Sequence, residues 1–222
     1  MKNENLLKEE ICNIGHKIYI NGFVAANDGN ISVKVSDNVF LTTPTGISKG
    51  DLTPEMIVKV NPYGEVLEGT YAPSSEIRVH LKVYEERPDV GSVIHAHPPF
   101  ATAYAVAGIP LDKCILPETI YLLGSVPIAK YCIPGSQELA DGLVKFLHNH
   151  DTILLENHGS ITLGADLTGA YFKLESLEFY AKITLLTKLI GNQKELSKYE
   201  IQKLVAKRKA SNIPGKHPLI NI

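Results

Sequence analysis

The segment VGSVIHAHPPFA, residues 90–101, closes an apolar run with two histidines, His95 and His97. Alternate residues of a β-strand point to the same face, so this spacing predicts two imidazole rings side by side. Burying both rings as simple packing is costly, because each has ring nitrogens that need partners. The pair therefore suits ligation of one metal ion, although one exposed histidine beside one hydrogen-bonded histidine fits the same pattern.

Two further residues can complete such a metal site. His158 lies in the short loop at 156–159 between two apolar stretches. Glu76 follows Ser74 and Ser75, either of which can cap the predicted helix that starts there. Three histidines and one carboxylate form an acceptable set of ligands for Zn²⁺, and other divalent metals that favour imidazole are also compatible. Taken singly, His158 fits a turn, and Glu76 fits a carboxylate that complements the helix dipole.

Three short segments rich in glycine and hydroxyl groups predict an anion site. Backbone N–H groups, hydroxyls and a helix N-terminus can together hold a phosphate group. The sequence contains no Walker motif and no GxGxxG, so a nucleotide is not indicated, and one phosphate on a small substrate fits better. Each segment alone also fits an ordinary turn; the segments are Asp28-Gly29-Asn30, Thr43-Pro44-Thr45-Gly46 and Pro73-Ser74-Ser75.

The bulk composition is that of a globular protein. The 222 residues, 44% apolar and 21% charged, suit one domain with a full core. The net charge of −2 argues against nucleic acid or a membrane surface as a partner, and the basic run at 203–209 reads as a solvated helix face. Three cysteines without a CxxC pair, a charged N-terminus without an apolar block, and no run of ~18 apolar residues predict a cytoplasmic location.

Hydrophobic periodicity and turn residues predict helices and strands in a mixed order. The combination favours one layered α/β domain with a mixed sheet. The expected helices span residues 4–21, 74–86, 137–148, 166–190 and 197–209, with a further helix opened by Pro98 and Pro99. The expected strands span residues 30–42 (as a hairpin), 56–60, 90–95, 125–131, 152–155 and 160–163.

Six short motifs follow one another over about residues 5–190: GNISV (29–33), TPTGI (43–47), PSSE (73–76), HAH (95–97), PGSQEL (134–139) and NHG (157–159). Taken as an ordered series, they resemble the class II aldolase/adducin family, and most of all its branch that cleaves L-fuculose 1-phosphate. The resemblance implies a single three-layer α/β/α domain over residues 1–222 with a central mixed, mostly antiparallel sheet. It also implies a homotetramer with active sites at subunit interfaces. Independently of the resemblance, the segment at about 191–222 is expected to be mobile, and its last part, residues 212–222, either folds over a neighbouring active site or frays.

The resemblance also assigns roles. His95, His97 and His158 would bind one Zn²⁺ per subunit, and Glu76 would be a ligand in the resting enzyme and the acid/base in catalysis. The reaction would be reversible aldol cleavage of L-fuculose 1-phosphate, or a similar deoxy-ketose 1-phosphate, to dihydroxyacetone phosphate and a short aldehyde such as lactaldehyde. The phosphate would be bound by Gly29, Asn30, Thr45, Gly46, Ser74 and Ser75.

The sequence departs from the fuculose pattern at one position. That pattern places a catalytic tyrosine from a neighbouring subunit beyond the histidine pair, where this chain has Pro117 or Glu118. Tyr121 lies three residues further on and can substitute only if the local backbone differs. Otherwise Glu118 takes part in proton transfer, and Tyr121 is a strand or interface aromatic. The identity of the aldehyde depends on this segment.

Other activities of the family remain as alternatives. A 4-epimerase similar to L-ribulose-5-phosphate 4-epimerase would use the same histidines, but that branch typically has aspartate where this chain has Glu76. A dehydratase of methylthioribulose 1-phosphate is a second alternative. An adducin-like binding domain is the third, and it would be expected to have lost the metal ligands, which this chain retains.

Overall fold

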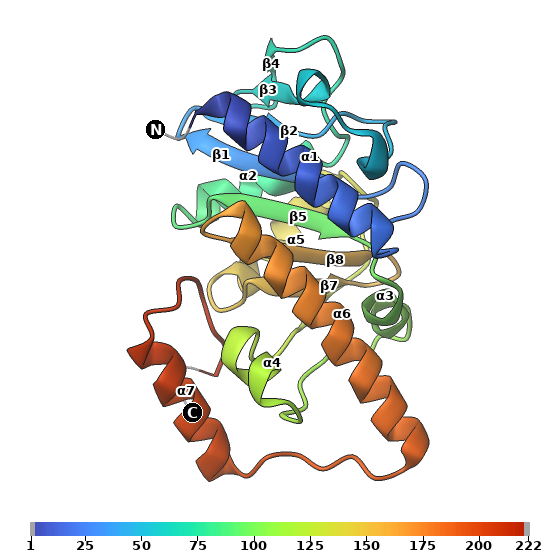
Figure 1. The fold of residues 1–222 in the computed structure, drawn as a ribbon, viewed down its shortest axis with the longest axis vertical. Coiled ribbons are helices and arrows are strands. Elements are labelled where there is room, and N and C mark those ends of the chain that lie inside the picture. Colours follow the sequence, from blue (N-terminus) through green and yellow to red (C-terminus); the bar gives the residue numbers. More distant parts are fainter. Residues whose placement is uncertain (1–2, 220–222) are drawn as a thin grey trace.

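The computed structural model describes residues 3–219, which form one eight-stranded sheet (Figure 1). The strand order is β4-β3-β2-β1-β5-β8-β7-β6, and every neighbouring pair is antiparallel except β6 with β7. The predicted mixed, mostly antiparallel sheet is thus confirmed. The strands are β1 (Asn30–Ser36), β2 (Val39–Thr42), β3 (Val58–Val60), β4 (Val66–Glu68), β5 (Ser92–Ala96), β6 (Ile128–Ala129), β7 (Thr152–Leu155) and β8 (Gly159–Gly164).

Helices cover both faces of the sheet. On one face, α1 (Glu4–Ile20) and α6 (Leu167–Ile190) share a hydrophobic core that includes Ile94. On the other face, α2 (Ile77–Glu86) and α5 (Gln137–Leu147) share a core that includes the adjacent Val93. Successive residues of a strand point to opposite faces, so β5 contributes to both cores and the α/β/α layering follows. No helix within residues 3–219 has the length and apolar character needed to cross a membrane.

Several elements differ from those expected. The strand predicted at 125–131 is only the two-residue β6, with an isolated bridge between Leu111 and Val126 before it. The segment around Tyr121 is a helix, α4 (Pro117–Leu122), so the reading of Tyr121 as a strand aromatic is wrong. Proline suits the first turn of a helix, but six residues are too few to show a helical apolar period. The remaining elements are α3 (Pro99–Val106), which starts at the predicted prolines, α7 (Lys198–Ala210), and the 3₁₀ turns η1 (Lys49–Asp51) and η2 (Pro54–Met56).

The C-terminal segment folds over the chain's own α4 (Figure 1). Arg208, in the basic run expected to be solvated, is only 2% exposed. It donates hydrogen bonds to the carbonyl oxygens of Tyr121 at 2.9 Å and Pro214 at 3.3 Å. His217 donates from Nε2 to the carbonyl oxygen of Ile120 at 2.6 Å. These donors satisfy carbonyls at the end of α4 that the helix itself leaves free. Residues 220–222 lie outside the described part.

This docking of the tail is expected to weaken in acid. Burial lowers the pKa of His217 from its usual value near 6.5 to about 4. Between pH 4 and 6.5, His217 binds a proton in the undocked tail but not in the docked tail. The free energy of docking is therefore most favourable above pH 6.5 and becomes less favourable as the pH falls toward 4. Amide exchange in residues 211–219 should therefore accelerate about tenfold per pH unit in this window, after correction for intrinsic exchange.

A variant that does not titrate provides the control. In His217→Gln the side-chain amide can still donate to the Ile120 carbonyl, but it gains no proton in this range. Its corrected exchange in the tail should show little acid dependence. An equal acceleration in both proteins would show that another group controls the tail.

Candidate active site

The backbone of β5 places His95 in the middle of the sheet. β5 is hydrogen-bonded to β1 on one side and β8 on the other, with His95 opposite Asn30 and Ile161. His97 follows directly after the strand, where its N–H donates to the carbonyl oxygen of Phe23 at 2.8 Å. The two imidazole centroids lie 4.8 Å apart, as expected for side chains two residues apart on one face.

The turn between β7 and β8 brings His158 to the same place. Asn157 has a left-handed backbone, with φ of 54°, which lets the chain reverse tightly. A Cβ at Gly159 would lie 2.5 Å from Cδ2 of His97, so only glycine allows this turn to press against the end of β5. The His158 ring centroid lies 4.5 Å from that of His95 and 5.0 Å from that of His97.

Hydrogen bonds orient these rings. His95 donates from Nδ1 to the carbonyl oxygen of Ser160 at 2.9 Å, which directs its Nε2 toward Nε2 of His97, 3.0 Å away. Nδ1 of His97 lies 3.5 Å from a carboxylate oxygen of Asp28. Burial, together with the neighbouring imidazoles, keeps the pKa of His95 well below its usual range, and burial also lowers that of His158. Neutral imidazole is the form that binds a metal.

Glu76 completes the cluster from the start of α2. It occupies the N-cap position, yet its carboxylate makes no capping hydrogen bond. Instead Oε2 accepts from the Asn30 amide at 2.9 Å and lies 3.1 Å from Nε2 of His95, while Oε1 is 3.6 Å from Nε2 of His158. Ser74, a predicted capping residue, accepts the N–H of Glu76 itself at 3.3 Å. The carboxylate is thus free to face the imidazoles.

The cluster fits a divalent metal ion. One ring nitrogen from each histidine can be chosen so that all three lie within 4.8 Å of one another. Buried polar atoms normally have hydrogen-bond partners, but Oε1 of Glu76 and Nδ1 of His158 are buried without any. Unpaired imidazole nitrogens beside a carboxylate are the ligand types that zinc and similar metals accept.

The predicted phosphate residues surround the same centre. They line a cavity of about 260 Å³ together with Glu76 and the three histidines. Two of the three loops are joined by backbone hydrogen bonds: Ser74 N–H to Thr43 O at 3.1 Å, and Thr45 N–H to Ala72 O at 3.0 Å. Among the described residues that line the cavity, none is a lysine or arginine. The predicted residues found there are Gly29, Asn30, Thr45, Gly46, Ser74 and Ser75.

Two predicted residues do not join this cavity. Glu118 and Tyr121 lie on α4 and are not among its lining residues. A catalytic role for either therefore requires α4 of a neighbouring subunit, and it stays a prediction. Conversely, Pro134 lines the cavity but was not predicted as a site residue, and Asp28 lines it although it was predicted only as part of an anion-binding segment, without a role of its own. Their signal was their position in the motif-bearing segments at 28–30 and 134–139.

Comparisons with known proteins identify the family of the chain. Residues 9–185 match the sequence model described as "Class II Aldolase and Adducin N-terminal domain". The L-fuculose phosphate aldolase of Methanococcus vannielii is 37% identical over 178 residues, covering 79% of this chain and 93% of that protein. The 3-oxo-tetronate 4-phosphate decarboxylase of Pectobacterium atrosepticum is 31% identical over 198 residues, covering 87% and 89%.

A solved structure extends the likeness to three dimensions. A structure of L-fuculose 1-phosphate aldolase superposes with a TM-score of 0.84 at 32% identity, covering 91% of this chain and 95% of that one. The shared fold, together with a family match over most of the chain, shows that the protein belongs to the class II aldolase and adducin family.

Proposed function

We propose that the protein catalyses reversible aldol cleavage of a deoxy-ketose 1-phosphate, such as L-fuculose 1-phosphate, to dihydroxyacetone phosphate and a short aldehyde such as lactaldehyde. One Zn²⁺ per subunit, held by His95, His97, His158 and Glu76, is part of the proposal. The observation that carries it is the convergence of these residues and the hydroxyl-rich loops on one cavity. Relatives named L-fuculose phosphate aldolase support the substrate class.

Different residues of the cavity are proposed to bind different parts of the substrate. The hydroxyls of Thr45, Ser74 and Ser75, with the side chain of Asn30, bind the phosphate end. When bound, the divalent metal supplies Lewis-acid polarisation of the substrate carbonyl. The buried carboxylate of Glu76 then moves a proton at the neighbouring carbon, a task that suits a group with one unpartnered oxygen in the cavity.

Aldol cleavage needs one proton removed from the substrate and one proton delivered to it. A base removes the proton of the C4 hydroxyl, the C3–C4 bond breaks, and C4 becomes the carbonyl carbon of the aldehyde that leaves. The electron pair of that bond passes to the C2 carbonyl, which leaves the enediolate of the three-carbon phosphate. Glu76 in its acid form delivers a proton to C3 of this enediolate, and in synthesis its carboxylate removes the same proton. Glu118 or Tyr121 of a neighbouring subunit is proposed for the C4 hydroxyl.

Decarboxylation of a 3-oxo acid phosphate is the second candidate. Relatives at 31% and 33% identity are named 3-oxo-tetronate 4-phosphate decarboxylases. Loss of CO₂ from such an acid leaves the same three-carbon enediolate, and protonation again gives dihydroxyacetone phosphate. This reaction needs no base for a C4 hydroxyl. The segment at Pro117 and Glu118, which lacks the tyrosine of the fuculose pattern, is therefore compatible with it.

A substrate screen is expected to identify the reaction. The metal-loaded protein is incubated with L-fuculose 1-phosphate, 5-deoxyribulose 1-phosphate, L-ribulose 5-phosphate and 3-oxo-tetronate 4-phosphate. Dihydroxyacetone phosphate is measured by a coupled assay, aldehyde by trapping, and CO₂ separately. The aldolase proposal predicts dihydroxyacetone phosphate and aldehyde in equal amounts from a ketose 1-phosphate, at least about 100-fold above the metal-free protein.

The other outcomes are distinct. CO₂ in place of aldehyde would assign the decarboxylase. Conversion of L-ribulose 5-phosphate without release of either fragment would assign the epimerase. Stoichiometric zinc in the purified protein is expected, and another metal that supports full turnover would replace zinc in the proposal.

The proposal extends to assembly and location. We expect one domain over residues 1–222 and a homotetramer whose active sites lie at subunit interfaces. An apolar stripe on the outer face of α6 supports subunit contact, since its residues repeat at helical spacing. All three cysteines are free, which suits the reducing cytoplasm. The stripe consists of Phe172, Phe179, Leu186 and Ile190, which are 51%, 57%, 41% and 77% exposed.

A further inference from the structure

Lys49 is a buried lysine that has no role in the proposed reaction as described above. It opens η1 and is only 1% exposed. Its ammonium donates to the carbonyl oxygens of Asn27 at 3.1 Å and Ile47 at 2.7 Å. In the described part of the chain these neutral carbonyls are its only hydrogen-bond partners, and no carboxylate lies within ion-pair distance. A buried charge with neutral partners alone is costly, so packing by itself does not account for an ammonium at this position.

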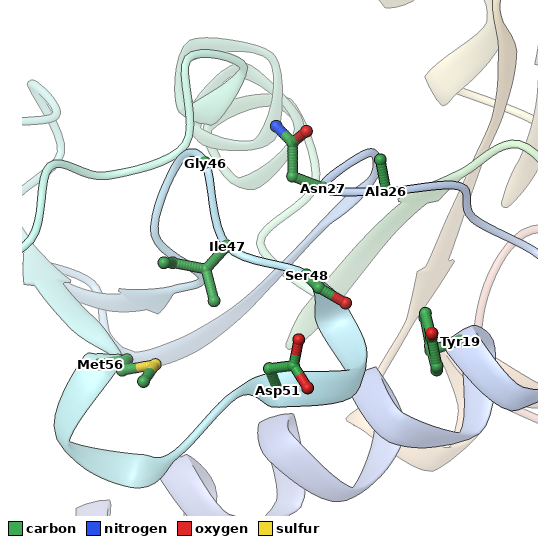
Figure 2. A pocket seen from close by; sticks show the side chains of 8 residues that line it. All are labelled: Tyr19, Ala26, Asn27, Gly46, Ile47, Ser48, Asp51 and Met56. Carbon is green, nitrogen blue, oxygen red and sulfur yellow. The ribbon is translucent and has the colours of Figure 1, made fainter.

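The two carbonyls belong to the two loops that form one side of the cavity. Asn27 begins the loop that continues through Gly29 and Asn30, and Ile47 ends the loop that contains Thr45 and Gly46. Figure 2 shows another pocket beside these loops, and Asn27, Gly46 and Ile47 are among the residues that line it. Asn27 and Gly46 line both spaces. The ammonium thus joins the loops and fixes their separation.

The backbone of η1 holds Lys49 in place. A Cβ at Gly15 of α1 would lie 2.9 Å from the carbonyl oxygen of Lys49, so η1 packs directly against the helix. The side chain of Ser48 accepts the N–H of Gly50 at 3.2 Å and closes the turn. The ammonium therefore extends from a rigid support rather than from a mobile loop.

The charge of Lys49 also matters to the cavity. The cavity walls contain the carboxylates of Asp28 and Glu76 but no lysine or arginine among the described lining residues. The proposed divalent metal would offset these two carboxylates, so a phosphate dianion would meet no surplus of positive charge from the lining side chains. Burial lowers the pKa of Lys49 to about 8, and the nearby carboxylate of Asp28 opposes the shift. Asp28 lines the cavity, so the ammonium lies close to its wall.

We propose that Lys49 is a positioning residue for the substrate phosphate: its buried ammonium ties the 27–30 loop to the 44–47 loop and supplies positive charge behind them. The inference rests on the proposed function, because it needs a phosphorylated substrate. Its ammonium makes no contact with the reacting atoms. Its contribution is to ligand binding, and it is specific for the phosphate group.

The test compares two ligands that differ only in phosphate. Calorimetry on the metal-loaded protein measures binding of dihydroxyacetone phosphate and of dihydroxyacetone. Lys49→Met keeps the apolar stem and removes the charge; it should weaken dihydroxyacetone phosphate about tenfold or more and leave dihydroxyacetone unchanged. With the substrate found in the screen, KM should rise by the same factor while kcat stays within about threefold. Lys49→Arg retains charge and donors and should recover most of the affinity.

Matched measurements separate the possible failures. Lys207→Met, an exposed lysine on α7, should bind both ligands as the wild type does. If the methionine variant does not fold, Lys49→Gln, which keeps an uncharged donor, replaces it. Unchanged dihydroxyacetone phosphate affinity, or equal loss of both ligands, would overturn the role of Lys49 while the proposed function stands. A wild type without preference for the phosphorylated ligand would refute the phosphate cavity, and with it both proposals.

Discussion

Replacing Glu76 with glutamine is expected to reduce turnover by about 100- to 10,000-fold, the range for loss of a positioned acid/base group. The substitution preserves shape, so Oε1 of the amide can take the place of the oxygen that accepts from Asn30. It removes the carboxylate that exchanges a proton with substrate carbon. Three histidines remain, so metal content should stay near that of the wild type. Initial rates of dihydroxyacetone phosphate release, with metal analysis of the same sample, provide the measurement.

Binding separates chemistry from folding in this variant. Glu76→Gln should bind dihydroxyacetone phosphate within about threefold of the wild type, because the phosphate contacts lie on other residues. Glu138→Gln, an exposed carboxylate in the first turn of α5, is the matched control and should be fully active. Turnover of Glu76→Gln close to that of the wild type would exclude Glu76 as the acid/base.

The second large effect is expected for His95→Ala, which should lose most of the bound metal and at least about 100-fold of the activity. The reason is that polarisation of the substrate by the metal lowers the activation free energy by several kcal/mol. His95 is central among the ligands, since its Nε2 lies 3.0 Å from that of His97 and 3.1 Å from Glu76. Its orientation is fixed by the carbonyl oxygen of Ser160. Mass spectrometry of metals in the dialysed protein measures the loss.

The control for this variant is a histidine outside the cluster. His16 is exposed on α1, so His16→Ala should keep the metal and the activity of the wild type. Thermal unfolding of both variants without metal shows whether His95→Ala still folds. Full metal occupancy in a folded His95→Ala would contradict the assignment of this residue as a ligand.

The sequence predicted the parts of the fold that follow from local periodicity. The spacing of Leu7, Ile11, Ile14 and Ile18 gave α1, and all four residues are buried as expected. The two-residue period placed His95 and His97 together. α4 was missed, because its six residues are too short to show a period. The N-cap of α2 was predicted at Ser74 or Ser75 but is Glu76. The Glu76 carboxylate contacts Asn30, which is distant in sequence, and this contact is invisible to a prediction from local capping preference.

Residues whose role depends on distant packing were not predictable. Lys49 stands in the polar turn ISKGDL, where a lysine is expected to be exposed, and its burial results from contact with α1. Arg208 belongs to a basic run and is buried only because α4 offers it a carbonyl from 87 positions away. By contrast, the predicted site residues that line the cavity were recognised because their types carry chemistry wherever they lie in the sequence.

The position of β5 has a consequence for how the site forms during synthesis. This strand lies between β1, which precedes it by about 60 residues, and β8, which follows it by about 65, as the hydrogen bonds of Ser92 and His95 show. A chain that emerges from the ribosome therefore exposes one edge of β5 until residue 164 of β8 is available. Before then His158 cannot join His95 and His97, so capture of the proposed metal would be a late event that follows closure of the sheet.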